Sequence, residues 1–211
     1  PVRLQYAVAA EVKRLPYRAQ AELLWRHDGH RYDAQLTLSA LFVGTRTQTS
    51  AGEITPEGLA PRRFSDKSRT ELAAHFDPAR GRVTFSANTP EAALLPGAQD
   101  RLSLFLQRGA LMAANPARFA PGSSVSVQTV GPRDAEVWEF RIAAGETLEV
   151  AGQPLETRKL TRAPRAEHDT RVELWLAPQL EYLPARIRIT QSSGDFVEQT
   201  LTGTEPAGAP R

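Results

Sequence analysis

Cysteine is absent from the chain, which excludes disulfide bonds, thiolate metal ligands and a cysteine nucleophile. Lysine is nearly absent too, since Lys13, Lys67 and Lys159 are the only lysines beside a large excess of arginine. The 26 basic residues nearly balance the 24 acidic ones, and a formal charge of +2 gives no reason to expect a nucleic-acid partner. No apolar run approaches the roughly 18 residues of a membrane-spanning helix. We therefore expect a globular chain without a transmembrane segment.

Sequence signatures of catalysis and cofactor binding are also missing. The chain has no Gly-x-Ser-x-Gly elbow, no glycine-rich phosphate loop, no His-Glu-x-x-His pair and no dinucleotide fingerprint. His27, Asp28 and His30 lie close together, but Asp28-Gly29 is typical of a hairpin turn, which favours a turn over a metal site. We therefore predict no catalytic residue, no metal and no cofactor.

The dominant feature of the sequence is a period of two. Apolar residues occupy the even positions from Val2 to Val12, with mostly polar residues between them, as in a strand with one solvent-facing side. The alternation continues through residues 17–42 and returns after residue 124. It predicts that residues 1–202 form a single domain of about ten to twelve strands. Residues 203–211, rich in proline, glycine and alanine, are expected to form a flexible tail.

One short helix interrupts this β pattern. Asp100 is a suitable N-cap and Asn115-Pro116 ends the helical pattern. We predict an all-β, mainly antiparallel fold, either a curled sheet or a partly open β-barrel, with this helix packed across it; a two-sheet sandwich is the alternative. The apolar side of the helix comprises Leu102, Phe105, Leu106, Gly109 and Met112.

Charged residues of the last third supply the candidate ligand-binding positions. Trp175 is out of phase with its apolar neighbours, so we expect an exposed ring that can stack on a ligand. His168 lies among carboxylates and arginines in residues 162–171, a composition that suits acid–base chemistry but also a charged loop. Arginines on the strands alternate with glutamates, which indicates cross-strand ion pairs as the competing interpretation. The candidate ligand-binding residues are Trp175, Arg158, Arg171, Arg186, Glu173 and His168.

The same region carries motifs of a known family. The motifs are Leu155–Leu160, Arg171–Pro178, Tyr182–Ile189 and the closing Gly194-Asp195-Phe196. They resemble the bacterial DUF3108 family, a domain of unknown function that is common in proteobacteria and typically exported to the periplasm. These motifs span residues 150–200, and a weaker β-rich pattern covers most of the chain. The family has no established catalytic residues to transfer. The resemblance implies a β-rich architecture and a periplasmic location.

Three functions remain open on the sequence alone. The favoured one is a non-enzymatic envelope protein that holds a lipid, a lipoprotein acyl chain or another amphipathic ligand in the concave face of the sheet. The second is a polysaccharide-binding protein or polysaccharide-acting enzyme that uses Glu167, His168, Asp169 or Glu173, with Trp175 as a sugar platform. The third is a scaffold that binds another envelope protein along an exposed sheet edge.

Overall fold

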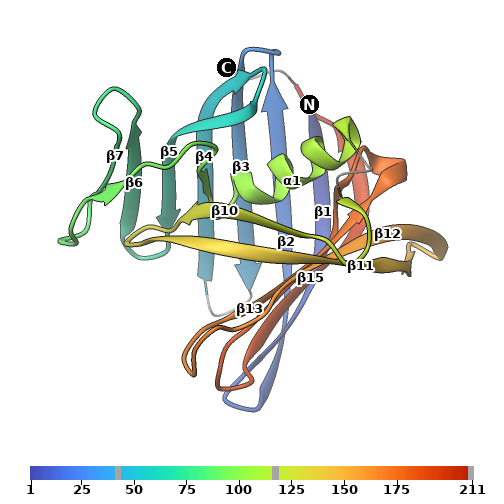
Figure 1. Ribbon diagram of the computed structural model, residues 1–211. Helices are drawn as coiled ribbons and strands as arrows, with labels where there is room; N and C mark the ends of the chain where they lie inside the picture. Colours follow the sequence, from blue (N-terminus) through green and yellow to red (C-terminus); the bar gives the residue numbers. More distant parts are fainter. Residues whose placement is uncertain (41–43, 116–118, 209–211) are drawn as a thin grey trace.

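The structure, a computed structural model, describes residues 1–40, 44–115 and 119–208 (Figure 1). Within this part of the chain, one curled sheet of 15 strands surrounds a single α-helix. Neighbouring strands are antiparallel except for β9 and β10, which are parallel. Phe42 and Pro116, two positions of the sequence patterns above, lie outside the described residues.

The strands divide into two halves, separated in the sequence by α1 (Ser103–Ala114) and its preceding turn. The first half contains β1 (Val2–Val12), β2 (Leu15–His27), β3 (Arg31–Ala40), β4 (Gly44–Thr55), β5 (Gly58–Lys67), β6 (Glu71–Asp77), β7 (Arg82–Phe85), β8 (Ala92–Ala93) and β9 (Gln99–Asp100). The second half contains β10 (Ser124–Val130), β11 (Ala135–Val150), β12 (Gln153–Arg162), β13 (Arg171–Ala177), the short 3₁₀ helix η2 (Pro178–Leu180), β14 (Leu183–Thr190) and β15 (Phe196–Pro206).

Strands β1 to β8 form one meander and β10 to β15 another, and the first and last long strands join the two. β1 pairs with β15, so the order runs from β8 through β1 and β15 to β9, and the sheet is not closed. This arrangement confirms the predicted antiparallel, partly open barrel with one helix. The strand number exceeds the predicted ten to twelve partly because β8 and β9 have only two residues each, too few to show an alternating pattern. Pro206 pairs with Val2, so β15 extends into the segment that was expected to be a tail.

Local irregularities in the ladders accompany the curl of the sheet. The register shifts at Gln5/Tyr6, Ala51/Gly52, Ile142/Gly145 and Trp175/Leu176. A bulge bends its strand and increases the local twist. The bulge in β11 lies near the middle of a 16-residue strand, and the far end of the β11–β12 hairpin curls away from the rest of the sheet (Figure 1).

Alternate side chains of the strands point to the concave face and form two buried clusters. The first belongs mainly to the N-terminal strands and includes Leu4, Tyr6, Leu23, Tyr32 and Phe64. The second belongs to the C-terminal strands and includes Phe140, Ile142, Leu160, Leu174 and Ile187.

The helix α1 lies across the concave face and contributes to both clusters (Figure 1). Leu102, at its N-terminal end, and Leu106 belong to the first cluster, and Leu104 and Phe105 belong to the second. Each fully buried side chain of this size stabilises the fold by roughly 1.5–3 kcal/mol. The apolar stripe correctly predicted the helix, but Leu104, outside that stripe, is fully buried as well.

A buried polar network fixes the N-terminal end of α1. Asp100, fully buried, accepts hydrogen bonds from the backbone N–H groups of Leu102 and Ser103 at 2.9 and 2.7 Å. Its second carboxylate oxygen accepts the Ser50 hydroxyl at 2.6 Å, and the Tyr32 hydroxyl lies 3.0 Å from Ser50 Oγ. Asp100 therefore caps the turn that leads into the helix and ties it to β3 and β4.

We expect Asp100→Asn to remove a pH dependence of stability between about pH 4 and 6. Burial raises the pKa of Asp100 from its usual 3.8 to about 6, despite the hydrogen bonds that favour its charged form. The folded state therefore binds this proton more tightly than the unfolded state. The resulting stability is complete below the unfolded pKa and is lost as the pH rises through the folded pKa, by up to about 3 kcal/mol.

Urea unfolding of the wild type and of Asp100→Asn across this pH range measures the effect. The wild type should lose stability relative to the variant as the pH rises. A difference that stays constant with pH would contradict the assignment.

A second expected outcome concerns Gly109, where α1 approaches the backbone near β14. A Cβ at this position would lie 2.4 Å from the carbonyl oxygen of Tyr182. Helix propensity favours alanine by about 1 kcal/mol, but overlap with a backbone atom opposes it, and we expect Gly109→Ala to destabilise the protein by about 1–3 kcal/mol. Gly208→Ala, with no atom within 4 Å, is the matched control for thermal unfolding. A higher Tm for Gly109→Ala would show that the approach is not tight.

Candidate functional site

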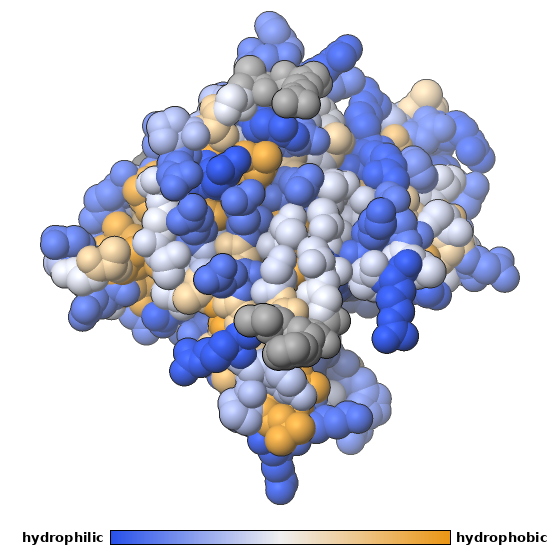
Figure 2. All heavy atoms as spheres, turned by 180° about the vertical axis from the view of Figure 1, so that it is seen from behind, coloured by the Kyte–Doolittle hydropathy of each residue, from blue (hydrophilic) through white to orange (hydrophobic). Residues whose placement is uncertain are grey.

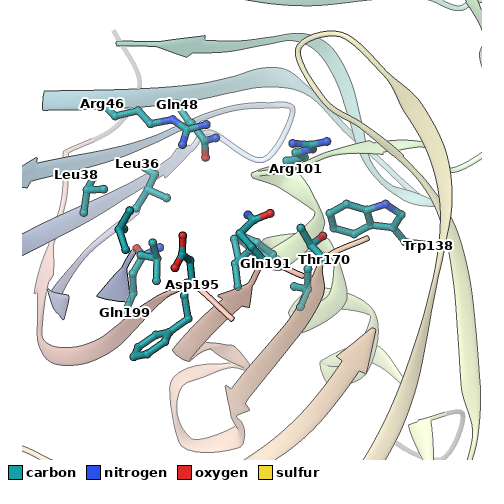
Figure 3. Close-up of a pocket in the computed structure, with 16 residues that line it drawn as sticks. Leu36, Leu38, Arg46, Gln48, Arg101, Trp138, Thr170, Gln191, Asp195 and Gln199 are labelled. Atoms are coloured by element: carbon teal, nitrogen blue, oxygen red, sulfur yellow. The ribbon is translucent and has the colours of Figure 1, made fainter. Parts of the chain in front are cut away.

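A cavity of about 520 Å³ opens on the concave face, beside the N-terminal end of α1 (Figure 3). Its walls come from β1, β3 and β4 on one side and from β11, β13, β14 and β15 on the other. Nine of its sixteen lining residues are apolar, among them Leu36, Leu38, Phe105, Val172, Ile189 and Val197.

The apolar wall follows directly from strand register. Val172 of β13 lies opposite Ile189 of β14, which lies opposite Val197 of β15. The three side chains therefore share one face and form a continuous row across three strands. Leu36 and Leu38 of β3 supply the facing wall (Figure 3).

Polar side chains border the cavity along β4. Arg46 and Gln48 lie opposite Leu38 and Leu36 in the ladder. Arg46 Nε donates to Asp66 Oδ1 at 2.8 Å, and Gln48 Nε2 donates to Asp66 Oδ2 at 2.9 Å. Burial on its own would raise the pKa of Asp66, but these hydrogen bonds and the Arg46 charge outweigh it, so the pKa lies below its ordinary value. Arg46 thus carries its own counter-ion.

Trp138 and Arg101 border the opposite side of the cavity (Figure 3), and both Arg101 and Arg162 contact the Trp138 ring. The guanidinium carbon of Arg162 lies 4.7 Å from the centre of the Trp138 ring, and that of Arg101 lies 5.9 Å away. Arg162 is 1% exposed and binds Asp169 at 2.8 Å, while Arg101 binds Asp134 at 2.9 Å. These contacts hold the indole in place and compensate both cationic charges.

Gln199 leaves a hydrogen-bonding group unpaired in the cavity wall. The residue is 8% exposed, and its side-chain oxygen is buried without a hydrogen-bond partner among the described residues. Gln199 lies between Val197 and Leu201 on the inward face of β15, so its carboxamide meets the cavity (Figure 3). An unpaired buried group of this kind costs roughly 1–3 kcal/mol. Gln199 is therefore a polar interruption in the otherwise apolar inward row of β15.

The sequence-predicted binding residues do not line this cavity. Trp175, Glu173 and Arg186 come together on the convex face, with the Arg186 guanidinium carbon 5.5 Å from the Trp175 ring centre. Trp175 is buried, contrary to the expected exposed ring. Leu148 of the curled β11–β12 hairpin packs with it, and Lys159 lies 4.5 Å from its ring centre while pairing with Glu173 at 3.1 Å. Periodicity placed Trp175 on the correct face but could not show that a hairpin covers it.

The remaining predicted residues are dispersed. Arg158, Arg171 and His168 are exposed, and His168 lies in the loop between β12 and β13. Arg186, by contrast, lies 4.0 Å from Glu198 on the neighbouring strand, as the cross-strand ion-pair interpretation expects.

The carboxylates proposed for polysaccharide chemistry do not face one another across a groove. Asp169 binds Arg162, which contacts Trp138 at the cavity, whereas Glu173 binds Lys159 on the convex face. Asp169 and Glu173 therefore lie on opposite faces of the sheet and do not form the pair of acids that flanks a glycosidic bond.

The segment from His27 to His30 forms a turn. The Asp28 carboxylate accepts the backbone N–H groups of His30 and Arg31 at 2.8 and 2.7 Å. In residues 1–40, 44–115 and 119–208, no three His, Asp or Glu side chains gather in a way that could hold a metal ion. Over the same residues, the structure contains no helix with the length and apolar character needed to cross a bilayer.

Comparison with known proteins gives a family and a fold. The sequence matches the family described as a protein of unknown function, DUF3108, over residues 5–202. No curated protein matches the chain. Among solved structures, a beta-barrel-like protein of the DUF1849 domain of unknown function, from Brucella abortus, matches with a TM-score of 0.60 at 8% identity, covering 99% of this chain and 98% of its own.

Two further structures match at lower TM-scores. One is described as an outer membrane lipoprotein-sorting protein domain from Vibrio parahaemolyticus, with a TM-score of 0.31 at 8% identity. The other is a DUF1329 family protein from Desulfovibrio piger, with a TM-score of 0.32 at 10% identity. Each covers 97% of this chain and 84% of its own. Of these three structures, the Brucella protein is the one whose TM-score indicates a shared fold.

We expect Arg162→Leu to destabilise the fold by about 3 kcal/mol, because it removes one partner of a buried ion pair and the donor to the Thr170 carbonyl. Arg165→Leu in the same loop is the control. Arg165 is 57% exposed in its side chain and lies 4.0 Å from Glu136, so its loss should change stability by less than about 0.5 kcal/mol. Chemical denaturation of both variants provides the measurement, and equal effects would disprove the special role of Arg162.

Proposed function

Because the chain belongs to the DUF3108 family, which is described without a function, we propose a function from the cavity itself: the protein binds a lipid-like, amphipathic ligand in the concave face of its sheet. The single observation that supports this proposal is the cavity of about 520 Å³ with its continuous apolar wall. Binding sites for small molecules typically measure about 300–1,000 Å³ and combine apolar walls with a few polar groups.

Different walls of the cavity suit different parts of such a ligand. The row of Val172, Ile189 and Val197 suits an aliphatic chain, since it offers no hydrogen-bonding group. The Gln199 carboxamide, a polar group in the same wall, suits a hydroxyl, amide or ester group on the same ligand. The cavity therefore fits an amphiphile better than a pure hydrocarbon.

The charged residues at the cavity limit the chemical class of ligand that it can bind. Arg46 and Arg101 border the cavity, but Asp66 and Asp134 neutralise them, and Asp195, which also lines the cavity, adds a further carboxylate. A ligand with several negative charges would have to displace these carboxylates, whereas a neutral hydrogen-bonding group would not. We therefore propose an acyl chain with an uncharged or singly charged polar end.

The proposed place of action is the cell envelope. This part of the proposal rests on the family resemblance, which implies export to the periplasm, where lipids and lipoproteins are available as ligands. The scaffold alternative has less structural support, since the edge strands β8 and β9 each contain two residues and offer a short template for pairing.

A dansyl-labelled fatty acid tests the cavity directly. We expect saturable binding with energy transfer from Trp138, which lines the cavity. Val197→Phe fills the apolar wall and should weaken binding on the order of 10-fold or more. Val137→Phe is the matched control, because Val137 is 42% exposed and lies outside the cavity.

A further variant separates binding from its optical signal. Trp138→Phe should greatly reduce energy transfer while the probe still competes with an unlabelled fatty acid. Absence of saturable binding to the wild type, or binding to folded Val197→Phe that equals the wild type, would overturn the proposed function.

A further inference from the structure

The tip of the β1–β2 hairpin, residues 10–18, exposes apolar side chains. Of the five large apolar residues that are exposed in the described part of the chain, three lie here: Val12, Leu15 and Tyr17. Leu15 is the most exposed of them, at 58%. The hairpin projects at one end of the molecule, where apolar atoms lie among hydrophilic residues (Figures 1 and 2).

Strand register makes these side chains a continuation of the cavity wall. Val12 pairs with Leu15, and Ala10 pairs with Tyr17, so all four share one face of the hairpin. That face is the concave one, and Val12 itself lines the cavity. An apolar strip therefore runs from the cavity to the outer end of the hairpin.

Cationic residues lie next to the exposed apolar residues along the hairpin, Lys13 and Arg14 in the turn and Arg18 on the other face. Lys13, Arg14 and Arg18 are exposed, and none of them forms an ion pair with another described residue. Glu11 is the one acidic residue of the tip, and the Asp195 carboxylate lies beside it, so three cations face two acids. The tip is also braced, because the Lys13 backbone N–H donates to Asp195 Oδ1 at 2.9 Å.

We propose that this hairpin tip docks on a bilayer surface that contains anionic phospholipids. Leu15, Tyr17 and Val12 enter the headgroup region, and the three cations contact lipid phosphates. Exposed aliphatic and aromatic side chains beside Lys and Arg are the combination that membrane interfaces favour, and anionic lipids attract such basic clusters. The inference goes beyond the proposed function, because surface docking does not require an occupied cavity.

Sedimentation with vesicles tests the docking. Vesicles of equal parts phosphatidylcholine and phosphatidylglycerol should bind the full chain, and pure phosphatidylcholine vesicles should bind it far less. Replacing Lys13, Arg14 and Arg18 together by Gln should weaken binding to the anionic vesicles by roughly 100-fold. Leu15→Ser should weaken it on the order of 10-fold.

Leu95→Ser is the matched control, since Leu95 is 43% exposed but lies outside the hairpin. It should leave vesicle binding unchanged, and all tip variants should melt and bind the dansyl-labelled fatty acid as the wild type does. Val197→Phe should still bind vesicles, which separates this proposal from that of the cavity.

Two results would overturn the docking. One is equal sedimentation of the wild type and the tip variants. The other is self-association that Leu15→Ser abolishes, in a wild type that does not bind vesicles, because the tip would then be an interface between copies of the chain.

Discussion

The burial of one helix between two halves of a sheet is the constraint on which the rest of this structure depends. A curled sheet has an apolar concave face that is too wide for its own side chains to fill. The helix α1 fills much of it, with Leu102 and Leu106 on one side and Leu104 and Phe105 on the other. What it leaves open is the cavity beside its N-terminal end.

The same constraint explains why a charged group lies at the centre of the fold. A helix that begins inside the barrel has N–H groups without water, and Asp100 satisfies two of them. Because the hydroxyl groups of Ser50 and Tyr32 continue this network, the helix has a defined position relative to β3 and β4. The wall formed by Leu36 and Leu38 on β3 is thus held at a fixed distance from that helix.

The alternating pattern of apolar residues predicts most of the fold, because each long strand has one buried face. It predicted the barrel-like sheet, and the change to a helical period predicted the single helix. Asp100 was expected to be the N-cap, but Leu102 occupies that position, and Asp100 instead caps the preceding turn through the N–H groups of Leu102 and Ser103. Short strands such as β8 could not be predicted from the sequence, since two residues cannot show a period. The cavity could not be predicted for another reason. It forms where inward side chains of distant strands leave space between them, and a periodic pattern shows only which side chains point inward.

The candidate site shows the same limit in particular residues. Gln199 stands in phase between Val197 and Leu201, and a polar residue in an inward row was the available signal for the cavity. The sequence pattern instead indicates Trp175 as a binding residue, because a tryptophan out of phase with its apolar neighbours suggests an exposed ring. Its burial depends on packing against Leu148 of the β11–β12 hairpin, and no local pattern predicts that contact.

The pairing of β1 with β15 has a consequence for how the chain reaches this structure. Almost every other strand pair joins neighbours in the sequence and can form as a local hairpin, whereas this one joins the strands that are farthest apart. Closing so long a loop is entropically unfavourable and slow. Each meander is therefore expected to form before β1 pairs with β15. Until that pairing forms, the apolar inner face of each meander is exposed to water, and such intermediates are prone to aggregation.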